Sequence, residues 1–183
     1  MTVLHEVEIS LHNVLLDGQP VETNAQGFEK IMELYQTLKV DYPKFYKMDE
    51  LCKLAFISAE LLLSAENPRL FNTENRAIIL FNRASSFATD SKFQTTISDI
   101  DNFFPSPALF VYTLPNITTG EIAIRNKYFG ESSFYVLERE NADQMREIIE
   151  TAFLDDKTES VLAGWVDFVD KNNFLAKLKL IKK

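Results

Sequence analysis

Residues able to do nucleophilic or metal chemistry are few in this chain of 183 residues. The single cysteine, Cys52, falls inside an apolar stretch of helical periodicity, which favours a small buried residue over a reactive thiol. The two histidines, His5 and His12, are seven residues apart on an expected strand and should face opposite sides of it. Neither this spacing nor any Cys/His/Asp cluster predicts zinc or iron. We expect no bound metal and no catalytic cysteine.

Carboxylates and glycine turns are the other candidates for chemistry. Asp90, Asp99 and Asp101 lie in a polar stretch, residues 83–108, which predicts a solvated loop with at most a short helix. General acid–base catalysis would need two carboxyls in different environments around one cleft. Gly120 follows two threonines, but no second glycine and no Lys-Ser/Thr pair completes a phosphate-binding loop. The sequence therefore predicts no cofactor.

The composition narrows the class of protein. Hydrophobic residues make up 46% of the chain and charged residues 25%, as in an ordinary globular domain, so residues 1–183 are expected to form one domain. A formal charge of −8 argues against binding to nucleic acid or anionic membranes. The N-terminus lacks the pattern of a signal peptide, and a single cysteine fits a reducing compartment. We expect a cytoplasmic protein.

Hydrophobic periodicity predicts helices placed between apolar strands. The stretch 48–66 is apolar on nearly all sides, so this helix should be covered on two faces. Residues 76–82 and 132–138 form short apolar runs typical of buried strands. Residues 160–169 and 174–182 flank a polar turn and predict a C-terminal β-hairpin. A further strand is expected from residue 3, ending in a turn at Asp17 and Gly18. Helices are expected at 24–38, 117–129 and 141–156, the last with Asn141 as its N-cap. The fold class is α/β, a mixed sheet covered by helices.

The order of several stretches resembles the N-terminal half of the β-ketoacyl synthases, the condensing enzymes of the thiolase fold. The likeness is carried by four stretches: YKMDELCKLAFISAELLL, NRAIILFNRASSFATD, the run from PSPALFVYTLPN to YFGESSFYVLE, and VLAGWVDFV. Together they cover roughly residues 45–170. The resemblance implies a thiolase-like half as the fold and a connection to the biosynthesis of fatty-acid or polyketide-type acyl chains.

The chain departs from the family where the chemistry should be. Counting from Gly130, the position of the family's catalytic cysteine is occupied by Arg139, whose guanidinium is permanently protonated and cannot accept an acyl group. Small residues around the nucleophile are replaced by Glu138, Glu140 and Asn141. The family's catalytic histidines lie in a C-terminal half to which nothing here corresponds. The resemblance therefore predicts a pseudoenzyme, without recognisable catalytic residues.

Partners follow from the same resemblance. In the family two similar halves pack together, and dimers extend the sheet through the strand before the nucleophile. We therefore predict a homodimer or a complex with a full-length ketosynthase. The expected interface comprises Leu51, Leu54, Leu62, Phe134 and Val136. Acyl carrier proteins are acidic and suit this acidic chain poorly. A local basic patch is the one route to carrier binding, with candidate residues Arg76, Arg83, Arg125 and Lys127.

Three functions remain open at this point. The leading hypothesis is a non-catalytic accessory or scaffold subunit in acyl-chain biosynthesis. The second is an acyl-transfer or condensing enzyme completed by a partner that supplies the nucleophile and histidines. The third is a binding module in which Arg139, in a remnant pocket, grips the carboxylate or phosphate of an acyl ligand.

Overall fold

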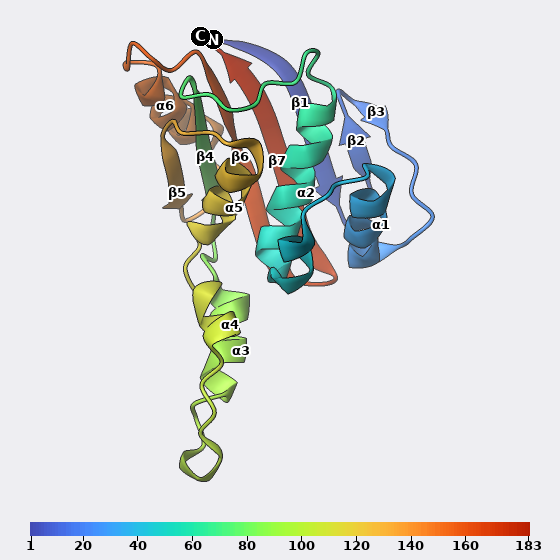
Figure 1. Cartoon of the computed structure of the whole chain (residues 1–183), viewed down its shortest axis with the longest axis vertical. Coiled ribbons are helices and arrows are strands. Elements are labelled where there is room, and N and C mark those ends of the chain that lie inside the picture. Colours follow the sequence, from blue (N-terminus) through green and yellow to red (C-terminus); the bar gives the residue numbers. More distant parts are fainter.

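A mixed sheet of seven strands forms the centre of the molecule, in the order β3-β2-β1-β7-β6-β4-β5. The computed structural model describes all residues, 1–183 (Figure 1). The two chain ends lie next to each other at one end of the sheet (Figure 1). The strands are β1 (Thr2–Ser10), β2 (Val14–Leu16), β3 (Gln19–Pro20), β4 (Arg76–Asn82), β5 (Ser132–Val136), β6 (Ser160–Asp170) and β7 (Asn173–Lys182).

Six α-helices accompany the sheet, with short 3-10 turns between them. No helix has the length and apolarity that a membrane span requires. The helices are α1 (Lys30–Thr37), α2 (Glu50–Ser64), α3 (Phe87–Thr95), α4 (Pro107–Val111), α5 (Ile117–Asn126) and α6 (Ala142–Ala152). The 3-10 turns are η1 (Gly27–Glu29), η2 (Pro43–Lys47) and η3 (Ile100–Asn102).

The strand pairing confirms the expected α/β class and the C-terminal hairpin. Strand β4 runs parallel to both β5 and β6, while β6–β7, β7–β1 and β1–β2 are antiparallel. The hairpin closes where Asp170 faces Asn173. The expected first strand is β1, but the chain bends after Ser10 and adds the short β2 before the predicted turn at Asp17 and Gly18.

Both faces of the central strands are buried, which explains their unbroken apolar sequences. On β4, Ile78 and Leu80 belong to the large core under α1, α2 and α5. Ile79 and Phe81 point the other way, into a smaller core under α6. Successive side chains of a strand alternate between faces, so a strand covered on both must be apolar throughout.

Helix α2 is the most deeply buried helix. Its N-terminus is capped by Asp49, whose carboxylate accepts a hydrogen bond from the Cys52 N–H at 2.9 Å. The helix contacts β1, β6 and β7 of the sheet and is flanked by α1 and α5 (Figure 1), while the rings of Tyr42 and Phe45 pack against Phe56 of the helix. The prediction of a helix covered on two faces is therefore confirmed.

The junction of β6 and β7 depends on one glycine. Gly164 has φ +156°, and a Cβ built there would lie 1.9 Å from the carbonyl oxygen of Lys177 on β7. A larger residue would push the two strands apart at the centre of the sheet. This close approach positions Trp165, the next residue, under α6.

Residues 83–116 form an arm that extends away from the body (Figure 1). Much of this segment was expected to be loop, but it contains α3 and α4, which pack together through the rings of Phe93 and Phe110. The Ser86 hydroxyl donates to the Thr113 carbonyl at 2.6 Å and joins the two ends of the arm at its root. The arm is therefore a folded projection.

Candidate functional site

The turn between β5 and α6 is where the family resemblance places a nucleophile. Hydrogen bonds hold both ends of this turn. The Leu137 N–H donates to the Asn82 carbonyl, and the Asn141 side chain caps α6 by accepting from the Gln144 N–H. Arg139 lies between them, exposed, and its side chain makes no hydrogen bond or ion pair. It also lines neither of the cavities described below. Arg139 therefore fills neither of these two cavities.

Strand β5 has one open edge. Glu131 and Leu137 bond through their backbones to β4, at Ile78 and Asn82. Because a parallel strand bonds to each neighbour through alternate residues, Phe134 and Val136 turn their backbone groups toward the open side. Val136 is 52% exposed and Phe134 is half-buried. The strand was expected to be buried; it instead ends the sheet and offers unpaired backbone groups to another chain.

The predicted interface on helix α2 is wrong. Leu51, Leu54 and Leu62 are buried within this chain, the last two completely. The prediction assumed that one sheet face was the only available cover. The structure places α1 and α5 on either side of α2, and these helices supply further contacts.

The arm exposes many large apolar side chains. Ile100 is 91% exposed and Phe104 is 74% exposed, both near its tip. The arm starts after Asn82, the residue to which the end of β5 is bonded, so the open edge and the arm share one corner of the molecule. The exposed set comprises Phe87, Ile100, Phe103, Phe104, Phe110, Val111 and Leu114. Sequence reasoning missed this surface, although the pair Phe103-Phe104 within a polar stretch was a signal.

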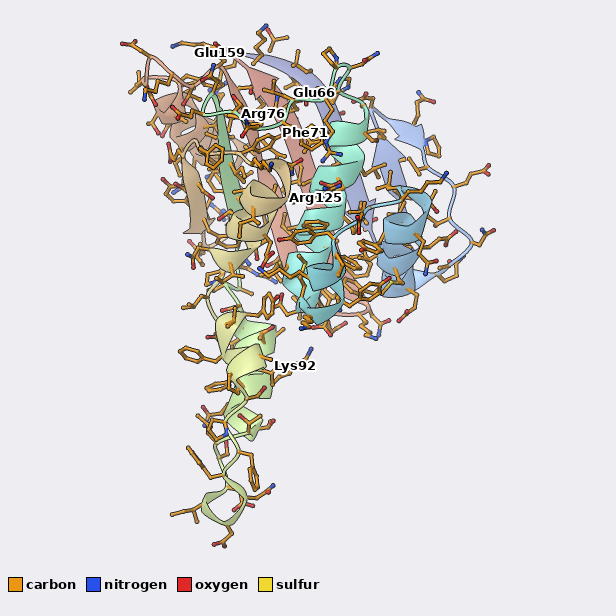
Figure 2. The ribbon with its side chains drawn as sticks, viewed as in Figure 1. Glu66, Phe71, Arg76, Lys92, Arg125 and Glu159 are labelled. Carbon is orange, nitrogen blue, oxygen red and sulfur yellow. The ribbon has the colours of Figure 1, made fainter.

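The arm is tied to the N-terminus of α2. The Thr89 hydroxyl donates to the Asp49 carboxylate at 2.5 Å, and Lys92 of α3 forms a 2.7 Å ion pair with Glu50 (Figure 2 labels Lys92). Burial raises the pKa of Asp49, although the hydrogen bonds from Thr89 and Cys52 act in the opposite direction. These contacts fix the direction of the arm.

Cys52 has the environment of an inert thiol. It is completely buried in α2, and burial raises its pKa well above the ordinary value. A polar cluster in the same region is structural: buried Glu121 of α5 accepts from the Tyr42 hydroxyl at 2.6 Å and from Lys44 at 2.9 Å. Burial, followed by the contact with Glu121, raises the pKa of Tyr42. A protonated, inaccessible thiol is a poor nucleophile.

The predicted basic patch does not form. Arg76 lies under the end of α2, where Glu66 accepts two hydrogen bonds from it, at 2.5 and 2.9 Å (Figure 2). Tyr128 accepts a third at 3.0 Å. Arg83 pairs with Asp167, and Arg125 lies 3.7 Å from Glu60. Arg76 is therefore buried and out of reach of an anionic partner, Arg125 is half-buried, and Arg83 stays exposed in its ion pair. Of the predicted set, only Lys127 has no ion-pair partner.

The remaining polar candidates have local roles. His5 lies 2.8 Å from the Asp17 carboxylate, whereas His12 falls beyond the end of β1, so the two do not share a strand as expected. Asp90 accepts from the Ser86 hydroxyl, and Asp99 caps a 3-10 turn through the Asp101 N–H. No group of three His, Cys, Asp or Glu side chains gathers in a geometry that would hold a metal ion.

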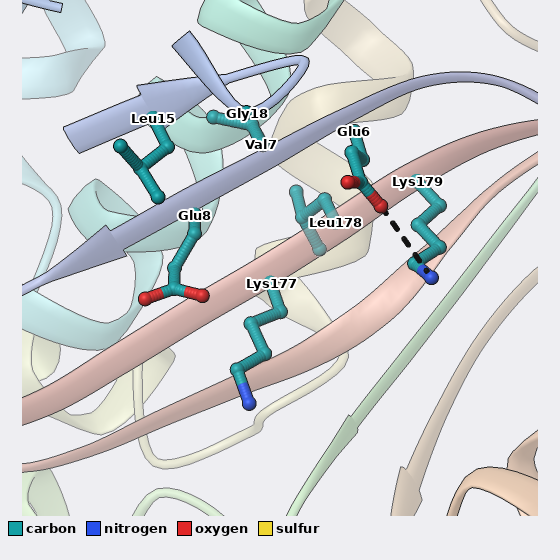
Figure 3. A pocket seen from close by; sticks show the side chains of 8 residues that line it. All are labelled: Glu6, Val7, Glu8, Leu15, Gly18, Lys177, Leu178 and Lys179. Carbon is teal, nitrogen blue, oxygen red and sulfur yellow. Dashed lines mark ion pairs between the residues drawn. The ribbon is translucent and has the colours of Figure 1, made fainter. Parts of the chain in front are cut away.

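The sheet face next to α6 is open at β1 and β7. Glu6, Glu8, Lys177 and Lys179 project there around a cavity of about 180 Å³ (Figure 3). Glu6 faces Lys179 and Glu8 faces Lys177 across the strands, and the first pair is separated by 3.6 Å. Opposite charges on facing strands stabilise a solvated surface. This cavity holds no combination of groups suited to catalysis.

No protein-family model and no curated protein matches this sequence. Solved structures match its fold. The ishigamide ketosynthase/chain length factor aligns with a TM-score of 0.71 and 12% identity over 99% of this chain and 61% of that chain. The ketosynthase ApeO in complex with its chain length factor ApeC, from Xenorhabdus doucetiae, aligns with a TM-score of 0.67 and 12% identity. The alignment covers 100% of this chain and 78% of that chain. AntDE:AntF, a type II PKS acyl-carrier protein in complex with its ketosynthase bound to the hexaketide, aligns with a TM-score of 0.56 and 12% identity. The alignment covers 84% of this chain and 57% of that chain.

These likenesses establish the fold. The chain has a thiolase-like α/β architecture, with a mixed sheet covered by helices and the two C-terminal strands in place. It spans 61% of the length of the ishigamide chain that it matches. At 12% identity the likeness concerns architecture, so activity and partners must be argued from the surface of this chain.

Proposed function

We propose that this chain is a non-catalytic accessory subunit that pairs with a full-length ketosynthase in the biosynthesis of fatty-acid or polyketide-type acyl chains. In this proposal residues 1–183 act as one domain equivalent to the N-terminal half of a ketosynthase. The observation that carries it is the open edge of β5, with the apolar arm at the same corner. Both features are unsatisfied in the single chain, and a partner strand would satisfy the first while a partner surface covers the second.

The fold comparison supports the choice of partner. One of the similar structures is a ketosynthase in complex with its chain length factor, so this architecture occurs in paired assemblies of that kind. A homodimer through the same edge is the alternative arrangement. Because exposed apolar side chains on the arm extend the contact beyond a single strand, we favour a large interface over strand pairing alone.

The absence of catalysis is proposed from the turn before α6. Arg139 occupies it, and the only thiol is inaccessible in α2. A partner-completed enzyme would need this chain to contribute a group to the shared site, and the open-edge strand β5 carries neither a cysteine nor a histidine. A condensation assay with carrier-bound substrates tests this: the partner's activity should be unchanged when Arg139→Ala or Cys52→Ala is present in the complex. Loss of activity with Cys52→Ala in a folded complex would contradict the proposal.

The pairing is tested by removing one outward-facing backbone N–H. Val136→Pro deletes the N–H of Val136 on the open side and leaves the bonds of β5 to β4 intact. The chain would be co-expressed with a full-length ketosynthase from the same gene neighbourhood and measured by size-exclusion chromatography with light scattering. Val136→Pro should weaken the complex by about tenfold or more, whereas the matched control Val136→Thr keeps the N–H and should bind normally.

The alternatives predict different results in the same experiment. A chain that is dimeric alone, and monomeric as Val136→Pro, would favour the homodimer. A chain that stays monomeric over a wide concentration range and binds no ketosynthase would reject pairing altogether. Thermal unfolding of each variant shows whether the fold is retained.

A further inference from the structure

A second surface feature lies on the other side of the sheet from α2. A groove with a volume of about 530 Å³ runs between α6 and strands β1, β6 and β7. This volume falls within the range of pockets that bind small molecules. The apolar lining consists of Met1, Val3, Ala142, Met145, Ile149, Ala163, Trp165 and Ile181. None of the residues predicted to form an interface, and no residue of the arm, takes part in it.

Small residues keep the groove open. Ala142 at the start of α6 and Ala163 on β6 line it from opposite sides, where longer side chains would fill the space. Gly164 lies between Ala163 and Trp165 and adds no side chain. The groove therefore arises from a specific set of short side chains next to long ones, as in a binding site.

The floor contains an unpaired hydrogen-bond donor. Trp165 is only 5% exposed, and its indole N–H makes no hydrogen bond within the chain. The indole nitrogen is not among the buried polar atoms that lack a partner, so it reaches the solvent of the groove and has room for an acceptor. A ligand in the groove that carries an oxygen would provide one.

The rim carries three cations in exposed ion pairs. Arg146, Lys177 and Lys179 border the groove, with Glu140 as the single acidic lining residue. These cations have surface partners: Lys177 lies 3.2 Å from Glu140, and Lys179 lies 3.6 Å from Glu6. Arg146 lies 3.7 Å or more from the carboxylates of its own helix, Asp143 and Glu150. Exposed pairs of this kind contribute little free energy, so a carboxylate arriving from solvent can replace one partner.

We infer that this groove binds an unbranched apolar chain ending in a carboxylate, such as a medium-chain fatty acid. The apolar walls would hold the hydrocarbon, and Lys177 or Arg146 would pair with the carboxylate at the rim. This inference goes beyond the pairing function and does not depend on it, because the groove and the open edge of β5 share no residue. It also places acyl binding in the groove, whereas the sequence had suggested Arg139.

The single tryptophan provides the measurement. Trp165 is the only tryptophan in the chain, so fluorescence reports on the groove alone. The isolated chain would be titrated with decanoate, decanol and decyltrimethylammonium below their micelle concentrations. Decanoate should shift the emission in a saturable way, decanol should bind more weakly, and the cationic amphiphile should bind least.

Two matched pairs of variants locate the binding. Ala142→Phe should fill the groove and abolish the decanoate response, whereas Gln144→Phe, exposed on the same helix but outside the groove, should not. Lys177→Gln should weaken decanoate by about threefold and leave decanol unchanged. Lys171→Gln, in the hairpin turn, is its control and should change neither.

Several outcomes would overturn the inference. Equal responses to all three amphiphiles, or a response that survives in Ala142→Phe, would show non-specific adsorption. A doubling of mass in light scattering that Ala142→Phe abolishes would show that a second copy of the chain occupies the groove. Val136→Pro separates the two proposals, because it should lose the ketosynthase and keep decanoate binding.

Discussion

Helix α2 and the arm are both rich in large apolar side chains, yet the structure uses them in opposite ways. In α2 every residue from Leu51 to Leu63 is buried except the half-buried Lys53, because the helix packs on the sheet and has α1 and α5 next to it. In the arm, apolar residues such as Ile100 and Phe104 project into solvent. Helix α2, the stretch predicted to need a partner chain, is covered by other elements of the same chain. The apolar side chains of the arm, which stand within a polar sequence, are not covered.

This difference shows that hydrophobicity along the chain does not identify an interface. A residue needs a partner only when the fold leaves it uncovered, and coverage depends on elements far away in sequence. In this molecule the cover of α2 comes from residues 30–37 and 117–126, on either side of it in the chain. The comparison yields four tests, from the largest expected effect to the smallest.

The largest effect on the unfolding free energy is expected at the buried ion pair of Arg76 and Glu66. Arg76→Met would leave Glu66 without its guanidinium at the end of α2, and breaking such a pair costs about 3–5 kcal/mol of unfolding free energy. Urea denaturation measures the loss. The control is Arg146→Met, whose ion pairs are exposed, and it should be nearly neutral. Equal losses in the two variants would contradict the assignment of Arg76 to the core.

A core truncation in α2 comes next. Leu62→Ala should lower the unfolding free energy by about 3 kcal/mol, because Leu62 is completely buried and its removal leaves a cavity. It should weaken pairing with a ketosynthase only as far as it unfolds the chain. If Leu62→Ala instead left stability unchanged and abolished the complex, the original prediction of an interface on α2 would be restored.

Low pH should lower the stability of the fold through the same ion pair, because it protonates Glu66. Burial would raise the pKa of Glu66, but the hydrogen bonds from Arg76 and the Leu70 N–H outweigh it and hold the pKa below the ordinary value of 4.5. A carboxyl with a lower pKa in the folded state stabilises the protein above its unfolded pKa and loses that contribution as the pH falls through the folded value. Glu66→Gln should therefore flatten the fall in stability below pH 4.5. Asp101→Asn, exposed in the arm, is the control for circular dichroism titrations.

The smallest effect on stability is expected in the arm. Phe104→Ser should change the unfolding free energy by less than about 0.5 kcal/mol, since the side chain is largely in solvent. The same variant should weaken ketosynthase binding measurably, which calorimetry of the complex can detect. A destabilised monomer with unaltered binding would reverse the roles assigned to α2 and the arm.

Much of the architecture followed from local pattern. The run 76–82 predicts β4 with its observed bounds, Arg76–Asn82, and the alternation after residue 173 predicts the hairpin. Asn141 was recognised as the cap of α6 from its residue type and position. These features depend on side-chain period and on contacts within a few residues, which a sequence displays directly.

The site was harder to predict. Val136 and Phe134 lie on a strand that was expected, but its position at the edge of the sheet depends on the order of strands. The arm was read as loop because its helices are short and, for α3, without a clear apolar face. The groove beside Trp165 brings together residues from both ends of the chain, Met1 and Ile181 among them. No local pattern indicates such a combination.

Local pattern in the sequence is enough to predict most of the strands and helices of the central layer and the cover on both faces of β4. Which apolar residues stay exposed depends on the tertiary structure. Burial is a property of the whole set of neighbours around a side chain, and those neighbours come from segments separated by tens of residues. For that reason α2 became core, and β5 and the arm became the surface available to a partner.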